Sequence, residues 1–172
     1  WNEFPGGRND AASNLVNDIN RDLMTLYQIL KHDADHFIAE ATPLFVPDNN
    51  QAERFYQLRE RFNLSSDPLE RSILFYYLNR HGFNGLCRYN KKGGFNVPFG
   101  RYTNPGMQRE SLDHFIEVAQ RTEFVCEDFA TVMERAEAGD VVYCDPPYVP
   151  LSDTAYFTCY AQDGFSMEQQ QQ

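Results

Sequence analysis

The stretch EFVCEDFATVMERAEAGDVVYCDPPY, residues 123–148, predicts the fold of this chain. Its first apolar run, residues 123–126, predicts a strand; residues 128–138 predict a helix, and residues 140–144 predict a further strand. Strands joined through one helix lie parallel in a sheet. The sequence therefore predicts an α/β fold that binds its ligands at the carboxyl ends of the strands.

Another short buried strand is predicted near the start of the chain, over residues 14–18. It ends at Asp18, just as the later strands lead to Asp128 and Asp145. One Asp at such a place often does no more than cap the next helix. Three at equivalent positions indicate a site.

The intervening residues predict helices and one hairpin. Leu23, Leu26, Tyr27 and Leu30 have helical spacing, and further helices are expected over residues 33–44, 51–62, 68–80 and 110–120. The start of the fourth is marked by Asp67, Pro68 and Glu70, and the glycine after His81 marks its end. Lys92-Gly93-Gly94 lies between two short apolar segments and predicts a β-hairpin within residues 82–102.

Charge is unevenly distributed along the chain. The net charge is −10, yet residues 71–109 contain no acidic residue and seven basic ones: Arg71, Arg80, Arg88, Lys91, Lys92, Arg101 and Arg109. The alternative is a chance gap in the acidic residues, whose probability is on the order of 0.002 for independent positions. An acidic body with one basic patch indicates a localised contact with a polyanion.

Length and composition exclude several classes of protein. A chain of 172 residues has room for one domain, or one domain with a small insert. The four cysteines form no C-x-x-C pair, so neither a zinc site nor a disulfide framework is expected. No apolar run approaches the ~18 residues of a membrane span, which predicts a cytoplasmic protein. The first thirteen residues have no periodicity and predict a loop.

Asp145-Pro146-Pro147-Tyr148 is the motif that indicates chemistry. Consecutive prolines leave the strand in one rigid shape, and their carbonyls are not committed to a regular helix. An acidic acceptor, a fixed carbonyl and an aromatic ring suit a flat amine. We expect Tyr148 to stack on that ligand while Asp145 and Pro146 accept its amino protons; the alternative is a Pro-Pro turn that only closes the strand.

This motif, and the order of the segments around it, resemble the adenine-N6 DNA methyltransferases, in particular the Dam group that methylates adenine in GATC. The matching segments are residues 18–20, 77–80, 84–90, 95–102, 141–148 and 150–152.

The resemblance implies a Rossmann-like methyltransferase core, interrupted by a helical target-recognition domain with a β-hairpin. Residues 1–20 and 110–172 would belong to the catalytic domain and residues 21–109 to the insert. S-adenosyl-L-methionine would be the methyl donor, with no metal. The partner would be double-stranded DNA, bound by a monomer at the nucleoid, with the target adenine flipped out of the duplex.

The resemblance also implies roles at the catalytic site. Asp18 would hold the ribose hydroxyls of the donor, and Asp128 with Phe129 would contact the donor's adenine. Asp145, Pro146, Pro147 and Tyr148 would hold the flipped base beside the donor, so that Asp145 belongs to both sets.

The DNA contacts that the resemblance implies lie in or beside the hairpin. Arg88 would read a guanine edge, and Phe83 would insert into the base stack. Asn84, Leu86 and Pro98 would contact or wedge the bases. The DNA backbone would be contacted by Arg80, Asn90, Asn96, Arg101 and Tyr102. For any one of these residues the alternative is an ordinary solvated surface side chain.

The chain also departs from this family. Where the family has F-x-G-x-G after a first strand, this sequence has Phe4-Pro5-Gly6-Gly7, close to Asp18 and without a strand before it, and the family's C-terminal strands are absent. We therefore expect an incomplete core, marginally stable and inactive by itself. Two alternatives are a non-catalytic DNA-binding remnant and a related methyltransferase acting on cytosine N4, RNA or a glutamine side chain. Asp145 argues against the second, because those groups tend to have Ser or Asn before Pro-Pro.

Overall fold

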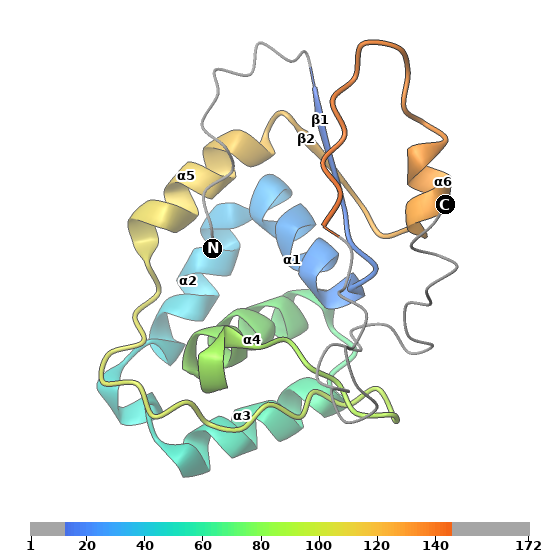
Figure 1. Cartoon of the computed structure of the whole chain (residues 1–172). Coiled ribbons are helices and arrows are strands. Elements are labelled where there is room, and N and C mark those ends of the chain that lie inside the picture. The colour runs from blue at the N-terminus through green and yellow to red at the C-terminus, as the bar shows by residue number, and fades with distance from the viewer. Residues whose placement is uncertain (1–12, 146–172) are drawn as a thin grey trace.

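The computed structural model describes residues 13–145 (Figure 1). Strands β1 (Asn14–Asn17) and β2 (Thr122–Val125) form a parallel pair, in which Asn14 lies beside Thr122 and Asn17 beside Val125. The chain between the two strands is mainly helical. The mixed helix-and-strand architecture expected from the sequence is confirmed.

The predicted helices between the strands are present. They are α1 (Arg21–His32), α2 (Ala34–Ala41), α3 (Ala52–Leu64), α4 (Pro68–His81) and α5 (Arg109–Ala119), with short 3₁₀ turns at Thr42–Leu44, Pro47–Asn49 and Phe83–Gly85. The start of α4 has the predicted cap, since the Glu70 amide donates a 2.7 Å hydrogen bond to Oδ1 of Asp67.

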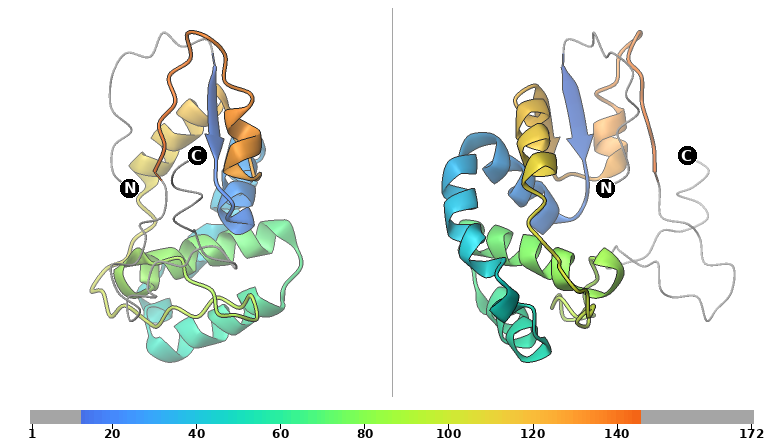
Figure 2. Two further views of the ribbon diagram at one scale, coloured as in Figure 1. Left: turned by 45° about the vertical axis from the view of Figure 1, so that its right-hand side comes forward. Right: turned by 90° about the vertical axis from the view of Figure 1, so that its left-hand side faces the viewer.

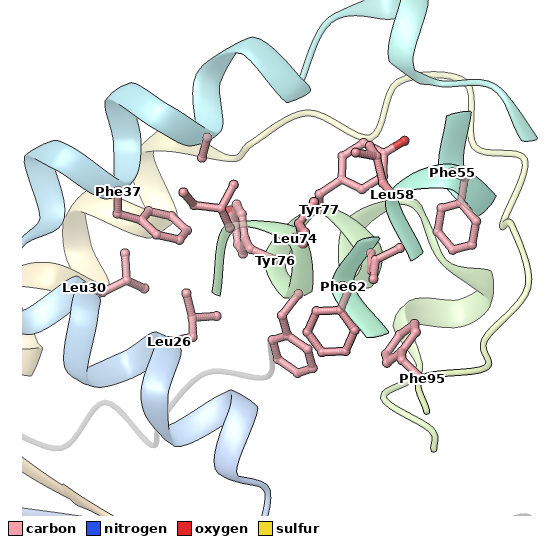
Figure 3. Packing of buried hydrophobic residues seen from close by; sticks show 14 of the residues in the cluster. Leu26, Leu30, Phe37, Phe55, Leu58, Phe62, Leu74, Tyr76, Tyr77 and Phe95 are labelled. Carbon is pink, nitrogen blue, oxygen red and sulfur yellow. The ribbon is translucent and has the colours of Figure 1, made fainter. Parts of the chain in front are cut away.

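The main core lies among the helices rather than on the sheet. Side chains from α1, α2, α3 and α4 meet in one apolar cluster (Figure 3), which includes Leu26, Phe37, Phe62, Tyr77 and Phe95. Aromatic rings dominate the cluster; Phe62 and Phe95, for example, meet edge to face with ring centroids 5.7 Å apart. This helical body supports the segment in which the DNA-contacting residues were predicted.

A smaller cluster joins the strands to the helices. Met24 of α1, Ala119 of α5 and Phe124 of β2 are buried together. Helix α5 lies on one side of the strand pair and α6 (Phe129–Met133) on the other (Figures 1 and 2). The face towards α5 is the better covered one, since Phe124 is buried whereas Leu15 and Glu123, on the opposite face, are exposed.

Three sequence predictions about the sheet region are corrected. Strand β1 is half-buried rather than buried, and α6 ends at Met133 instead of near Ala138. Residues 140–144 are not a strand in the described part of the chain. Val141 is 97% exposed and Tyr143 85% exposed, so this segment has neither a neighbouring strand nor a covering layer to stabilise it there.

Gly82 ends α4 as predicted, but for a different reason. Its backbone is extended (φ −79°, ψ 153°) and not left-handed, as a typical C-terminal glycine would be. A Cβ at this position would lie 2.5 Å from the carbonyl oxygen of Leu78. Glycine is needed here for a close approach to the helix.

The predicted hairpin has its two arms and its turn, but its arms are not regular strands. Two antiparallel arms, residues 82–90 and 94–102, are joined by a turn and paired at two isolated bridges, Gly82–Phe99 and Tyr89–Phe95. The ladder stops because Pro98 has no N–H to donate and the Leu86 amide bonds Phe83 O at 3.2 Å. The N–H and C=O of Phe95 face away from the other arm, and Asn63 of α3 bonds both, at 2.8 and 3.2 Å. The result is a pair of arms clamped to α3 rather than two regular strands.

Some predictions fall on residues 1–12 and 146–172, outside the described part of the chain. They are the N-terminal loop, apart from its last residue, and the positions of Pro146, Pro147 and Tyr148. Within residues 13–145, no helix is both long enough and apolar enough to cross a membrane.

Candidate functional site

Two of the predicted site carboxylates follow the strand pair at the same edge. Because β1 and β2 are parallel, Asp18 and Asp128 both follow carboxyl ends. The loops that carry them are tied together, since Asn17 Nδ2 donates to Glu127 O at 3.1 Å and the Glu127 amide donates back to Asn17 Oδ1 at 3.0 Å. The structure thus brings these two loops side by side, as their positions after parallel strands suggested.

The carboxylates of Asp18 and Asp128 differ in the hydrogen bonds that they accept. Oδ1 of Asp128 accepts from the Ala130 amide at 2.9 Å and caps α6. Oδ1 of Asp18 accepts from the Asn20 amide at 2.7 Å, while its Oδ2 has no hydrogen-bond partner within residues 13–145. Asp18 is exposed and therefore offers a carboxylate oxygen to a ligand at this edge.

Phe129 and Asp145 are the other described residues that were predicted to belong to the catalytic site. Phe129 begins α6 and is partly exposed beside the Asp128 cap. Asp145 is exposed and does not follow a strand in the described residues, so the expectation of three acids at equivalent strand ends holds for Asp18 and Asp128 only.

The predicted DNA-contacting residues, by contrast, are brought together on the two arms and the adjoining end of α4. The arms are linked at their base, where the Phe83 amide donates to Pro98 O at 2.9 Å. Further out, the Asn84 amide donates to the Tyr102 hydroxyl at 2.8 Å. Arg80, in the last turn of α4, donates to Gly106 O at 3.2 Å. One continuous segment thus presents all of these positions.

The side chains on the arms differ in accessibility. Phe83 is 48% exposed, and Pro98 and Arg101 are exposed as well. Leu86 is partly buried and packs against the main core. Asn90 builds the turn, because its Oδ1 accepts from the amides of residues 92 and 94 at 2.8 and 3.1 Å. Phe83, Pro98 and Arg101 are therefore more available to a partner than Leu86, whereas Asn90 is exposed but uses its side-chain oxygen in the turn.

The Arg88 side chain is held by the opposite arm. Its Nε donates to Oδ1 of Asn96 at 2.8 Å, and its Nη2 donates to the Asn96 carbonyl at 3.3 Å. The Asn96 amide in turn donates to the Arg88 carbonyl at 3.0 Å. These contacts fix the guanidinium relative to the arms.

Sequence reasoning missed the residues that support this segment. Asn79 of α4 donates from Nδ2 to Gly85 O at 2.6 Å and to Cys87 Sγ at 3.4 Å. It braces a turn in which Asn84 and Gly85 have positive φ angles of 53° and 62°. Asn-Gly is a well-known signal for consecutive left-handed residues, so the turn itself was visible in the sequence.

The basic patch is smaller than the sequence count suggested. Arg71 donates to Asp22 Oδ1 at 2.8 Å with both side chains largely buried (26% and 17% exposed), and Arg109 pairs with Asp113 at 2.8 Å. These acids lie outside residues 71–109, so a sequence window missed them. Within the described residues, five cations of the patch face no acidic partner: Arg80, Arg88, Lys91, Lys92 and Arg101.

A cleft of about 670 Å³ lies between α1, α4 and the two arms. Its walls include Tyr27, Asn79, Cys87 and Tyr102. Burial raises the pKa of the Cys87 thiol to about 11 and that of Tyr27 to about 12, and the Asp18 carboxylate adds to both shifts. The Asp18 carboxylate therefore acts, after burial, on two groups of the cleft wall.

In the part of the chain that the structure describes, no three His, Cys, Asp or Glu side chains are grouped so that they could hold a metal ion.

Comparison with known proteins identifies the family. The family model described as D12 class N6 adenine-specific DNA methyltransferase matches residues 8–172. The chain is 53% identical over 161 residues to the DNA adenine methylase of Escherichia coli (strain K12), and 51% identical to those of Vibrio cholerae over 161 residues and Serratia marcescens over 162. Each comparison covers 94% of this chain, which spans 58% of the first two relatives and 60% of the third. The chain therefore belongs to the D12 class of N6 adenine-specific DNA methyltransferases.

Proposed function

We propose that the whole protein transfers a methyl group from S-adenosyl-L-methionine to N6 of adenine in double-stranded DNA, with GATC as its site. The main support is the family match over residues 8–172, which includes the Asp145-Pro146-Pro147-Tyr148 motif. A DNA substrate would place the protein at the nucleoid in the cytoplasm.

The proposed architecture is a Rossmann-like core with a helical insert. Residues 1–20 and 110–172 would form the catalytic part and residues 21–109 the recognition part. The parallel β1–β2 pair with α5 and α6 on opposite sides supports the first assignment. The large core of the helical body, most of whose buried members lie within residues 21–109, supports the second.

The residues at the sheet edge fit the proposed methyl donor. Asp18 is exposed at the carboxyl end of a parallel strand and keeps one carboxylate oxygen available, as a contact to vicinal ribose hydroxyls requires. Asp128 and Phe129 stand beside it at the start of α6, where they would contact the donor's adenine. When bound, the donor supplies an electrophilic methyl group on a sulfonium.

The protein's part in the reaction would be positioning and charge stabilisation. Asp145 would accept a hydrogen bond from the target amine together with the Pro146 carbonyl, and Tyr148 would stack on the base. As the nitrogen gains positive charge, the Asp145 carboxylate would stabilise it. The base has to leave the duplex first, because N6 is out of reach while it is stacked and paired. A monomer bound to the duplex through the arms would both flip the base and transfer the methyl group.

Methyl transfer by the whole protein tests this proposal. Wild type should convert adenine to N6-methyladenine in a GATC duplex with S-adenosyl-L-methionine, measured by mass spectrometry of the digested DNA. Asp145→Asn should lower the rate at least about a hundredfold with little change in duplex affinity, because the arms are untouched. Asp140→Asn is the matched control, since this exposed acid lies just outside the motif.

The alternatives give different results. A whole protein that binds the duplex but neither binds nor uses the donor would be a non-catalytic DNA-binding protein. Methyl groups found on cytosine would identify a related amino-methyltransferase instead. Asp145→Asn with a normal rate would remove this residue from the mechanism.

A further inference from the structure

Arg88 and Asn96 face each other across the two arms, and their contacts leave one part of the guanidinium open. A guanidinium is planar and has five N–H donors, which form two forks of parallel bonds. Asn96 takes the fork made by Nε and Nη2, through Oδ1 at 2.8 Å and its carbonyl at 3.3 Å. Within residues 13–145, Nη1 has no hydrogen-bond partner. The fork made by Nη1 and Nη2 therefore stays available.

The residue that holds Arg88 is itself firmly held. Phe95 and Val97, on either side of Asn96, are buried. Asn63 of α3 bonds both backbone groups of Phe95, and Arg59 of α3 donates to Val97 O at 2.9 Å. Because neighbours in an extended chain point to opposite sides, burial of these two residues leaves Asn96 on the outer side of its arm.

From this arrangement we propose that Asn96 is a positioning residue for base recognition: it holds the side fork of Arg88 so that the end fork is presented to a guanine edge. The inference rests on the proposed function, in which Arg88 reads guanine. It changes the role expected for Asn96, which the family resemblance placed among the contacts to the DNA backbone.

Orientation of the fork matters because guanine offers two acceptors, O6 and N7, side by side. A guanidinium bonded at Nε and Nη2 has lost most of its rotation about the last side-chain bonds. Ordering that would otherwise occur on binding is then already present in the protein, which favours the base whose two acceptors match the fork. Asn96 thus affects discrimination between bases without touching them.

Two duplexes test the proposal at the level of single atoms. In one, 7-deazaguanine replaces the guanine of GATC and removes N7; in the other, inosine replaces it and keeps both O6 and N7. We expect wild type to bind the 7-deazaguanine duplex roughly tenfold more weakly than GATC, and the inosine duplex nearly as well as GATC. Fluorescence anisotropy of labelled duplexes gives the dissociation constants, and from them the ratio of each to that for GATC.

Variants of Asn96 separate positioning from charge. Asn96→Ala should reduce the ratio of the affinities for the GATC and 7-deazaguanine duplexes from about ten to about two or less. The backbone bonds between the arms should preserve the fold of this variant, which circular dichroism checks. Asn96→Asp keeps the acceptor and should restore the ratio, although its charge weakens binding to every duplex. Lys92→Ala, an exposed cation on the turn, should weaken all duplexes equally and leave the ratio unchanged. A wild-type ratio in Asn96→Ala would overturn the proposal.

A measurement without DNA keeps this test apart from the proposed function. The Nε–H resonance of Arg88, assigned by its loss in Arg88→Lys, should exchange slowly with water in wild type and Asn96→Asp, and rapidly in Asn96→Ala. The exposed Arg101 gives the reference for a free guanidinium. If Arg88 exchanges as fast as Arg101 in wild type, Asn96 does not hold it. If the Arg88 Nε–H is protected but the protein binds all duplexes equally, Asn96 still orients Arg88, and it is the proposal that Arg88 reads guanine that is wrong.

Discussion

The hydroxyl of Tyr89 donates a 2.7 Å hydrogen bond to Oδ2 of Asp22, a residue 67 positions earlier in the chain. The other oxygen of the same carboxylate accepts from Arg71 of α4, from Nε at 3.0 Å and from Nη2 at 2.8 Å. Asp22 lies in the first turn of α1, just after the Asp18 loop. One carboxylate therefore ties together the start of α1, helix α4 and the arm that carries Arg88.

Removing one partner of this carboxylate should destabilise the fold measurably. Tyr89→Phe leaves a partly buried oxygen without its donor and should lower the free energy of unfolding by about 1–2 kcal/mol. Asp22→Ala also removes the only carboxylate paired with Arg71 in the described residues, although Arg71 keeps its bonds to Phe62 O and Ser65 O, and should cost about 3 kcal/mol. Urea unfolding followed by circular dichroism measures both. Arg109→Ala, which breaks an exposed ion pair, is the control and should change stability by less than about 1 kcal/mol. Equal effects of all three would show that the Asp22 contacts contribute little.

Arg88 and Arg101 carry the same charge but should differ in what they contribute to DNA binding. If Arg88 reads guanine as proposed, Arg88→Ala should cost about 1–3 kcal/mol of discrimination at the guanine of the proposed GATC site, because the bidentate base contact would be lost. Arg101 is exposed and has no partner in the described residues, so Arg101→Ala should weaken all sequences alike and lower the salt slope by about one. Binding to GATC and to substituted duplexes over a salt series distinguishes the two. Identical, sequence-independent losses would make Arg88 part of the electrostatic patch only.

Cys87 should be the slowest to react of the described cysteines. Its pKa is raised to about 11, chiefly by burial, whereas Cys126 and Cys144 are exposed. At pH 8 only about one Cys87 in a thousand would be a thiolate, the reactive form. Timed alkylation with peptide mass spectrometry should label Cys126 and Cys144 first. Asn79→Ala, which removes a contact to the sulfur, tests whether the cleft wall protects Cys87. Early labelling of Cys87 in wild type would show that the cleft opens readily.

His81 should make the fold sensitive to mild acid. Its buried ring stacks on Tyr77 and its Nδ1 bonds the Tyr77 carbonyl at 2.9 Å; burial lowers the pKa of His81 from 6.5 to about 4. The unfolded chain binds the His81 proton more tightly than the folded one. The contribution of neutral His81 to the free energy of unfolding is therefore complete above about pH 6.5 and is lost as the pH falls towards 4. The loss is at most ~3 kcal/mol.

Measuring unfolding at pH 4.5 and 7.5 tests this point. His81→Phe keeps an aromatic ring against Tyr77 but has no titrating group, so the difference between the two pH values should shrink. A difference as large as in wild type would assign the acid sensitivity to carboxylates instead.

Much of the fold could be predicted from patterns within short stretches of the sequence. The start of α4 could be predicted because Asp67, Pro68 and Glu70 act within one turn. The adjacent loops of Asp18 and Asp128 could be predicted because parallel strands end at one edge. The candidate site residues were likewise predicted as sets, one at the sheet edge and one on the arms.

Contacts between distant residues could not be predicted in this way. The pairing of Arg71 with Asp22 joins positions 49 apart, so the charge window overestimated the basic patch. The arms form no regular ladder because Pro98 has no N–H and the Leu86 amide bonds Phe83 O instead of the other arm. Residues 140–144 have the apolar pattern of a strand, but a pattern does not supply the neighbour to which a strand must bond.

The division of the core has a consequence for how the molecule fluctuates. Among residues 13–145, the buried members of the main cluster all come from residues 26–112, whereas three buried residues join the strands to α1 and α5. Local opening should therefore begin at the strand pair, where few apolar contacts are lost, and the helical body should open last. In hydrogen exchange the amides of α3 and α4 would then outlast those of β1 and β2. The arms that carry Arg88 and Asn96 would keep their shape while the edge that carries Asp18 and Asp128 opens and closes.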